Sequence, residues 1–339
     1  MFFNFFLSII ISAFLSFTFS PFVRKFFIKK GYIEYPEEKQ KKTKNATAIQ
    51  PVPRGGGIIV FLAILITSCL FLKIDKHFIG IFLAGFIALI IGVWDDIKDI
   101  SPKIRLFTNI IVGLIIVLSG IGITFISNPF GGIIDLSFFP YLSDILAIIW
   151  IVWCMNIVGW STGVDGQLPG FTAISAFFIG LLAFRFSQDI LQWPVIILAG
   201  AVSGAFLGFL PFNLFPQVMM PGYSGKSLAG FFLAVLAILS GAKLATVILL
   251  LGIPMIDAIF VLIKRFFQKK PLFISDDNHL HHQLLKSGWS RSRIAIFYWS
   301  ISFVLGLISL FLNSSQKFYV FIGLFILFCG FLINLYQRK

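Results

Sequence analysis

The sequence predicts an all-α protein, a polytopic helical bundle in a membrane, and three observations support this. Of the 339 residues, 58% are hydrophobic and only 12% are charged, which is far from the composition of a soluble domain. The apolar segments are close to 20 residues long, as a helix needs to cross a hydrocarbon layer of about 30 Å. They recur along the whole chain, so we expect one transmembrane domain over residues 1–339, with about eleven spans and ten as the lower count.

The first apolar segment, residues 3–20, has no basic residue before it and is followed at once by a basic stretch. This charge order is the reverse of that in a signal peptide, so we expect an uncleaved span with the N-terminus outside the cell. The other spans are expected at about 55–73, 78–94, 105–125, 144–158, 168–186, 193–211, 227–241, 243–263, 295–312 and 318–335. With this topology, 22 of the 27 lysines and arginines lie in cytoplasmic segments, in agreement with the positive-inside rule.

The net charge of +13 is best explained by cytoplasmic loops that face anionic lipid and anionic substrates, and we expect no nucleic-acid partner. The three cysteines lie within or at the edge of apolar runs, which indicates core packing and neither disulfides nor a thiolate metal site. Those cysteines are Cys69, Cys154 and Cys329.

Two glycine patterns concern helix packing. The triple glycine at 55–57 follows Arg54, and it could either expose N–H groups to an anion or let helices approach closely, with packing slightly favoured. Gly200, Gly204 and Gly208 recur every four residues within one span, which indicates close helix packing in lipid.

Asp95, Asp96 and Asp99 place three carboxylates within five residues, where the third span ends. Adjacent carboxylates repel one another unless a cation neutralises them, and a hard ion such as Mg²⁺ prefers oxygen ligands. A solvated acidic turn at a helix end is the alternative. The motif alone does not decide between the two.

Two further loops are predicted on the same face as this cluster. In the loop at 156–170, Asn156 and Asp165 could supply oxygen ligands or bind a sugar nucleotide, whereas its glycines could form only a turn. The loop at 211–227 ends in a Gly-x-x-Gly-Lys-Ser sequence that lacks the βαβ setting of a nucleotide hydrolase. Its glycines, with Lys226 and Ser227 at a helix start, can nevertheless bind a phosphate.

Asp257 lies inside the ninth predicted span, in its cytoplasmic half, and an intramembrane carboxylate usually marks a site or a paired partner. The next loop contains His279, His281 and His282, three of the four histidines in the chain. Closely spaced imidazoles can bind zinc, but no other soft ligand accompanies them. Contact with a diphosphate or with uridine is the sharper alternative.

Five motifs thus follow one another on one predicted face. They are Pro-Arg-Gly-Gly-Gly at 53–57, Asp-Asp-x-x-Asp at 95–99, Asn156 with Val-Asp-Gly at 164–166, Phe-x-x-Phe-Asn-x-x-Pro at 209–216 with its glycine-rich loop, and His-x-His-His at 279–282. Over essentially the whole chain, this order resembles the polyprenyl-phosphate N-acetylhexosamine-1-phosphate transferases, glycosyltransferase family 4. The sequence at 279–285 is more similar to the branch that uses UDP-N-acetylglucosamine than to the phospho-N-acetylmuramoyl-pentapeptide transferases.

The resemblance implies transfer of a sugar-1-phosphate, with N-acetylglucosamine-1-phosphate expected, from a UDP-sugar to undecaprenyl or another polyprenyl phosphate. UMP would be released, in cell-envelope glycan synthesis at the cytoplasmic face of the bacterial plasma membrane. The implied cofactor is Mg²⁺, with Mn²⁺ as a substitute, and a homodimer is a further expectation.

The resemblance also implies roles for individual residues. The metal ligands would be Asp95, Asp96 and Asp165, and the catalytic residues would be these three with Asp99 and His281. The substrate-binding residues would be Arg54, Lys98, Asn156, Asn213, Gly222, Tyr223, Lys226, Ser227, His279, His281 and His282. Metal-binding and positioning roles are expected first for Asp96, because a phosphate with a second pKa near 6 hardly needs a base.

The chain departs from the family pattern at three positions. Gly159 and Thr162 stand where the family has Asn and Asp, and Tyr223 replaces a metal-binding aspartate. A phenol is a poor ligand for Mg²⁺. Four other aspartates could compensate: Asp165, Asp257, Asp276 and Asp277. The diphosphate could also supply more ligands, or the activity could be altered or lost; because the rest of the glycine-rich loop persists, we favour a working, divergent enzyme.

Two hypotheses from other functional classes compete with the enzyme hypothesis. A transporter or flippase of polyprenyl lipid predicts charges near the membrane midplane and paired broken helices. Here all carboxylates except Asp257 lie at span ends or in loops, and no internal repeat is evident, which favours chemistry at the interface. A non-catalytic lipid-binding scaffold is the other competitor.

Overall fold

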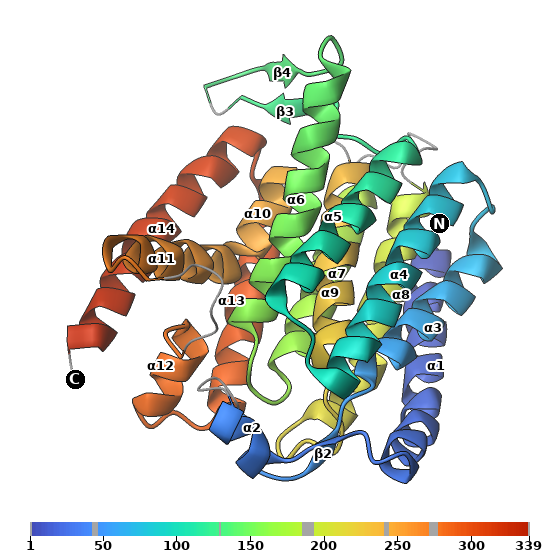
Figure 1. The fold of residues 1–339 in the computed structure, drawn as a ribbon. Coiled ribbons are helices and arrows are strands. Elements are labelled where there is room, and N and C mark those ends of the chain that lie inside the picture. Colours follow the sequence, from blue (N-terminus) through green and yellow to red (C-terminus); the bar gives the residue numbers. More distant parts are fainter. Residues whose placement is uncertain are drawn as a thin grey trace.

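The computed structural model describes residues 2–42, 47–128, 130–184, 193–240, 244–270 and 277–337. It is a bundle of helices with two small antiparallel pairs of strands (Figure 1), so the predicted all-α class is confirmed. The helices are α1 (Phe2–Lys29), α2 (Pro36–Lys42), α3 (Gly56–Phe71), α4 (Lys76–Lys98), α5 (Pro102–Leu118), α6 (Pro140–Ser161), α7 (Gln167–Phe184), α8 (Trp193–Asn213), α9 (Gly222–Leu239), α10 (Leu244–Leu250), α11 (Gly252–Phe267), α12 (Leu280–Lys286), α13 (Arg291–Phe311) and α14 (Ser314–Gln337). The strands are β1 (Ile33–Glu34), β2 (Val52–Pro53), β3 (Phe125–Ser127) and β4 (Ile133–Asp135).

The apolar helices correspond to the predicted spans. Within the described ranges, eight helices are long and apolar enough to cross a membrane, and the count is nine if the bent pair α10–α11 is one span. The helices α3 and α5 are shorter, with 16 and 17 residues. Each predicted span therefore has a helix or a bent pair of helices at its position, and the chain is a multi-pass membrane protein.

The packing of α1 against α8 explains the glycine repeat. A Cβ atom at Gly204 or Gly208 would overlap the backbone carbonyls of Ile9 and Ala13 on α1. On the facing side, Ser12 donates its hydroxyl to the carbonyl of Ala201 at 2.6 Å. The predicted close packing is therefore confirmed, and it places α1 beside α8, one of the most buried helices of the bundle.

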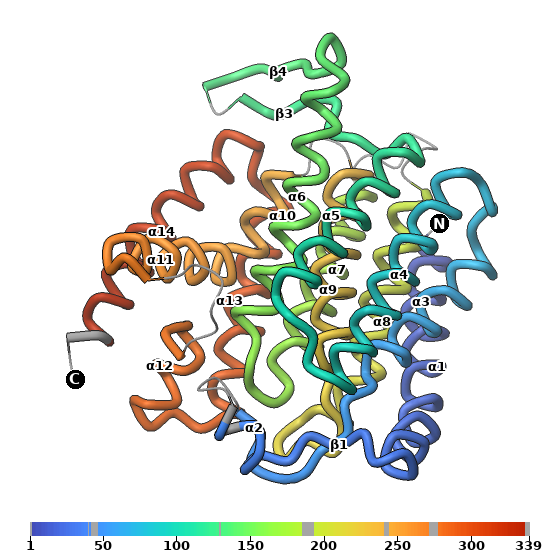
Figure 2. Tube along the Cα trace, in the orientation of Figure 1, coloured from blue at the N-terminus to red at the C-terminus, as the bar shows by residue number. Residues whose placement is uncertain are grey.

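The ninth predicted span, residues 243–263, is not one straight helix. It breaks at Leu251, and the axes of α10 and α11 differ by 75°. Gly252 and Pro254 account for the break, because proline lacks the N–H group for the helix ladder and its ring clashes with the preceding turn. Past the break, α11 packs on α6 and α14 and extends sideways from the bundle (Figure 2).

The two ends of the bundle carry different structures (Figure 1). The β3–β4 hairpin lies at one end, and α2, the β1–β2 pair and α12 lie at the other, which we call the site end. The first turn of α9 and the last turn of α4 also meet there, because the N–H group of Tyr223 on α9 donates to Asp96 on α4. The predicted polar motifs thus gather at one end. The prediction that this end faces the cytoplasm stays a prediction.

Candidate active site

Asp96, in the last turn of α4, binds the start of α9. Its Oδ1 accepts from Tyr223 N–H at 2.6 Å, and its Oδ2 accepts from Ser224 N–H at 3.2 Å and from the Ser224 hydroxyl at 2.6 Å. The first N–H groups of a helix have no partner within the helix and carry its positive dipole end. Asp96 therefore caps α9 from another helix, and its charge is compensated there.

Gly222 makes this contact possible. Its φ angle is +68°, in the left-handed region, and a Cβ atom at this position would overlap the carboxylate of Asp96. Gly92 on α4 is needed for the same approach, because a Cβ atom there would overlap the backbone of Ser224. Both glycines are positional requirements for the α4–α9 contact. Gly222 therefore acts on Asp96, whereas the sequence suggested contact with substrate.

Asp95 pairs with an arginine that the sequence analysis missed. Its Oδ1 accepts from Arg105 Nε at 2.7 Å and from the backbone N–H of Ile100 at 3.0 Å, and Arg105 Nη2 lies 2.6 Å away. The sequence feature that could have predicted this pair lies directly after the aspartates. A Ser101-Pro102 helix start directly after the aspartates predicts a tight reversal, which brings Arg105, in the first turn of α5, back beside α4.

Asp99 ends α4 in a left-handed conformation and binds two cations. Lys39 Nζ, on α2, lies 2.5 Å from its Oδ1, and Arg54 Nη1 lies 3.3 Å from the same atom. Partial burial opposes ionisation of Asp99, but the bonds and charges of Lys39 and Arg54 outweigh it and lower its pKa. Arg54 also pairs with Glu34 of β1. Glu34 of β1, Lys39 of α2 and Arg54 are thus linked to the aspartate cluster.

Lys226, near the start of α9, interacts electrostatically with both the aspartate cluster and the histidines. It interacts electrostatically with Asp96 and Arg54, and its own charge acts on His281 and His282. Lys226, Arg54 and Arg105 place three cations around two buried carboxylates. Such an arrangement can bind an anion with several oxygens.

The histidine segment contacts the loop between α6 and α7. His281 is buried against Gly163, where a Cβ atom would overlap the imidazole, and its Nδ1 has no hydrogen-bond partner. Burial, with His282 and His279 as neighbours, lowers the pKa of His281 well below its usual value. Burial and the His279 imidazole lower the pKa of His282 to about 4. Both rings are therefore neutral at pH 7 and available as hydrogen-bonding groups.

Asp165 and Asn213 connect the two loops at the site end. Asp165 lies 3.4 Å from Arg291 Nη1 and accepts from Gln217 N–H at 3.4 Å. Its burial raises its pKa, although Arg291 and Gln217 oppose the effect. Asn213 accepts from Gly166 N–H at 3.0 Å and donates to Gln217 Oε1 at 2.7 Å. The buried Asn213 amide thus ties the loops together, whereas the sequence suggested substrate binding.

Three other predicted residues lie apart from these contacts. Asn156 donates to the carbonyl of Val152 in its own helix at 2.7 Å, Lys98 is exposed on the last turn of α4, and Ser227 is buried on α9. Of the aspartates proposed to compensate for Tyr223, Asp276 lies outside the described residues, and Asp277 pairs with Lys286.

The predicted metal ligands do not form a closed cage. Within the described ranges, no group of three or more His, Cys, Asp or Glu side chains could hold a metal ion. Asp95 and Asp96 do present two adjacent carboxylates. Mg²⁺ is commonly held by one or two carboxylates together with substrate phosphates and water. Asp96 already accepts three hydrogen bonds and Asp95 is paired with Arg105, so this pair could hold a cation only if a diphosphate and water supplied most of its ligands.

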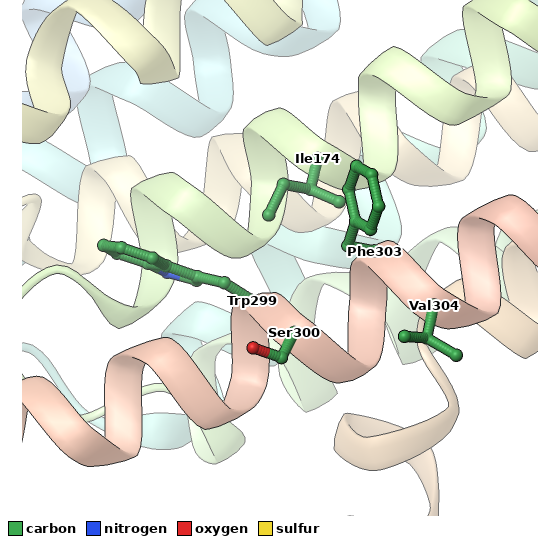
Figure 3. Close-up of a pocket in the computed structure, with 5 residues that line it drawn as sticks. All are labelled: Ile174, Trp299, Ser300, Phe303 and Val304. Carbon is green, nitrogen blue, oxygen red and sulfur yellow. The ribbon is translucent and has the colours of Figure 1, made fainter.

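A separate apolar pocket of about 400 Å³ lies between α7 and α13 (Figure 3). Its lining residues are Ile174, Trp299, Ser300, Phe303 and Val304. None of them is ionisable, and Trp299 also donates to the Gly166 carbonyl at 3.1 Å. The pocket has no charged group that could bind or activate a phosphate, so it is not the candidate site.

The fold and the site together define a multi-pass membrane protein with a cluster of paired acidic and basic side chains at one end of its helical bundle. A model of glycosyl transferase family 4 matches residues 78–241, which include the aspartate cluster, the loop with Asp165 and the start of α9. Over this stretch, just under half of its length, the chain is similar to glycosyl transferase family 4, and it is a multi-pass bacterial membrane protein.

Individual relatives match along most of the chain. A probable undecaprenyl-phosphate N-acetylglucosaminyl 1-phosphate transferase of Bacillus subtilis is 26% identical over 91% of this chain and 84% of its own length. The undecaprenyl-phosphate alpha-N-acetylglucosaminyl 1-phosphate transferase of Thermotoga maritima is 29% identical over 96% and 94%. A phospho-N-acetylmuramoyl-pentapeptide-transferase of Bacillus thuringiensis is 29% identical over 90% and 95%.

Proposed function

We propose that this protein transfers N-acetylglucosamine-1-phosphate from UDP-N-acetylglucosamine to a polyprenyl phosphate at the cytoplasmic face of the membrane and releases UMP. The observation that carries the proposal is the contact of Asp96 with the start of α9, which brings Lys226 to the same end of the bundle as the aspartate pair. Both substrates are anions, and one is a lipid. A cation-rich site at the end of a membrane bundle suits both, and the names of the Bacillus subtilis and Thermotoga maritima relatives support the reaction.

In the proposed reaction, a phosphate oxygen of the lipid attacks the phosphorus that carries the sugar. The bond from this phosphorus to the oxygen of UMP breaks, and UMP leaves with the electron pair. Negative charge accumulates on the oxygens of the diphosphate, where Lys226 and Arg54 would stabilise it. The lipid phosphate is largely ionised at neutral pH, so the reaction needs positioning more than a base.

We also propose that Mg²⁺ takes part, with Mn²⁺ as a substitute. Asp95 and Asp96 would hold it, and the diphosphate oxygens would complete its ligands. When bound, the ion would neutralise charge on the diphosphate. The test is removal of divalent cations with a chelator, which should abolish UMP release, and Mg²⁺ should restore it. A rate unchanged by the chelator would contradict the metal proposal. The predicted homodimer stays a prediction.

The central experiment measures UMP release from UDP-N-acetylglucosamine by the purified protein with undecaprenyl phosphate and Mg²⁺. A panel of other UDP-sugars belongs in the same assay, because some relatives are pentapeptide transferases. UMP release only with UDP-N-acetylmuramoyl-pentapeptide would change the sugar and keep the reaction. Absence of UMP release with every UDP-sugar would reject the enzyme in favour of a lipid-binding scaffold or a transporter.

Asp96→Asn tests the aspartate pair. The amide would turn an N–H donor toward the N–H groups of Tyr223 and Ser224, and we expect UMP release to fall at least about a hundredfold. Asp135→Asn, at an exposed position of the β3–β4 hairpin, is the matched control and should keep the wild-type rate. Melting temperatures of both variants separate loss of chemistry from loss of fold. Full turnover by Asp96→Asn would refute the proposed role.

A further inference from the structure

Asp257 is a buried carboxylate that the proposed reaction does not yet use. It lies on α11, just past the break at Leu251, and its side chain is 1% exposed. Its Oδ2 lies 2.9 Å from His279 Nδ1, and its Oδ1 accepts from the backbone N–H of Leu280 at 2.8 Å. Both oxygens are therefore directed at the residues where α12 begins.

The contact fixes both the position and the tautomer of His279. A carboxylate only accepts hydrogen bonds, so the proton of a neutral His279 ring lies on Nδ1, and Nε2 keeps a free lone pair. The bond to Leu280 N–H holds the backbone next to the ring, and His279 itself provides no side-chain cap for α12. The imidazole can therefore neither rotate nor exchange its proton position without losing the carboxylate.

The oriented ring lies at the site end, next to His281 and Trp160. It lies nearly parallel to the His281 ring, with centroids 6.2 Å apart, and 6.5 Å from the Trp160 ring. His281 and His282 in turn feel the charge of Lys226. The side chain of His279 is 10% exposed, so the ring is accessible from the site only over a small area. A ligand that reaches it meets one defined edge of the ring.

We propose that Asp257 is a positioning residue, which holds His279 so that the Nε2 lone pair can accept a hydrogen bond from an O–H or N–H group of the UDP-sugar. This inference rests on the proposed transferase function. It assigns a role to the break between α10 and α11, because the break sets the direction of α11 and so brings Asp257 under the histidine segment. A carboxylate that only joined α11 to α12 would stabilise the fold without acting through His279, and the experiments separate these cases.

The first experiment compares Asp257→Asn with a matched control in the UMP-release assay. Asparagine keeps the size of the side chain, but its amide can donate to Nδ1 and so permits the other tautomer. We expect kcat/KM to fall about 10- to 100-fold, the loss typical when the carboxylate behind a functional histidine is removed. Asp135→Asn removes an exposed carboxylate from the β3–β4 hairpin at the opposite end of the bundle and should stay within about twofold of wild type.

A double-mutant cycle then tests whether Asp257 acts through His279. In a His279→Gln protein, the further change Asp257→Asn should alter kcat/KM by less than about twofold, because the group to be oriented is already gone. An equal loss in both backgrounds would show an independent structural role and overturn the proposal. Asp257→Glu, which keeps the carboxylate, should recover part of the rate.

The last measurement does not need activity. ¹⁵N spectra of the histidine rings report the tautomer, and the chain has only four histidines, so His279→Gln identifies the relevant signals. We expect Nδ1–H in the wild type and a mixture of tautomers in Asp257→Asn. An unchanged His279 tautomer in Asp257→Asn would overturn the proposal. Failure of the wild type to release UMP would instead reject the proposed function, and the spectra would still decide the positioning.

Discussion

Tyr223 is linked to both members of the aspartate pair, to Asp96 directly and to Asp95 through Arg105. Its backbone N–H donates to Asp96, and its ring lies 4.8 Å from the guanidinium of Arg105, which binds Asp95. An aromatic ring in this position favours the arginine through a cation–π contact. The side chain therefore supports the cation that neutralises Asp95 and offers no anionic ligand of its own.

Replacing this ring by a carboxylate should change cation binding. Tyr223→Asp would place a third acidic side chain beside Asp95 and Asp96, and like charges close together favour a divalent ion. We expect Mn²⁺ to bind about tenfold or more tightly in the absence of nucleotide, as measured by electron paramagnetic resonance. Tyr223→Phe keeps the ring and should bind as the wild type does. Equal Mn²⁺ affinity in the two variants would contradict the explanation.

The neutral histidines predict a pH-dependent stability. His282 has a pKa of about 4 in the folded protein and near 6.5 when unfolded, so the unfolded chain binds more protons between these values. The contribution of the neutral His282 side chain to the free energy of unfolding is complete above pH 6.5. It is lost as the pH falls toward 4, and the total loss is about 3 kcal/mol. The melting temperature should drop between pH 7 and 5, and less so in His282→Gln. Parallel curves for the two proteins would contradict this.

Some site residues were predictable because they stand in compact motifs. Asp95, Asp96 and Lys226 are recognisable by their spacing to other polar or glycine residues. Glu34 and Lys39 were not predictable as site residues, because the sequence around a single charged residue in a basic loop does not indicate its ion-pair partner. Their partners, Arg54 and Asp99, are distant in sequence, and only the fold brings them together.

At the scale of elements, the closest packing in the bundle depends on glycine. Gly204 meets the carbonyl of Ile9, a backbone atom that cannot move aside easily. The sequence predicted this packing from a four-residue repeat, since one face of a helix repeats at that interval. The break at Leu251 was missed because hydropathy is continuous across it, although Gly252 and Pro254 are the physical cause.

Gly204→Ala tests the α1–α8 contact. Overpacking a tight site costs about 1–3 kcal/mol, so we expect a lower melting temperature in detergent. Gly330→Ala, on α14, is the matched control, because nothing lies within 4 Å of a Cβ atom there and alanine favours the helix. If Gly204→Ala melts no lower than Gly330→Ala, the close contact does not limit stability.

At the scale of the whole molecule, the bundle separates two chemically different ends. The predicted orientation puts the site end in the cytoplasm, and impermeant maleimide labelling of intact cells can check it. In a background with Cys69 and Cys329 replaced, Phe130→Cys at the exposed hairpin should react directly, whereas Ser287→Cys at the site end should react only after permeabilisation. The reverse pattern would invert the topology.

The contact between Asp96 and the start of α9 joins residues 128 positions apart. While the ribosome is still synthesising the intervening helices, this carboxylate lacks both the amides and the hydroxyl that later surround it. Its burial becomes favourable only once Ser224 has emerged and α9 has inserted beside α4. The same hydrogen bonds therefore shape the candidate active site and also distinguish a chain in which α9 has inserted from one in which it has not.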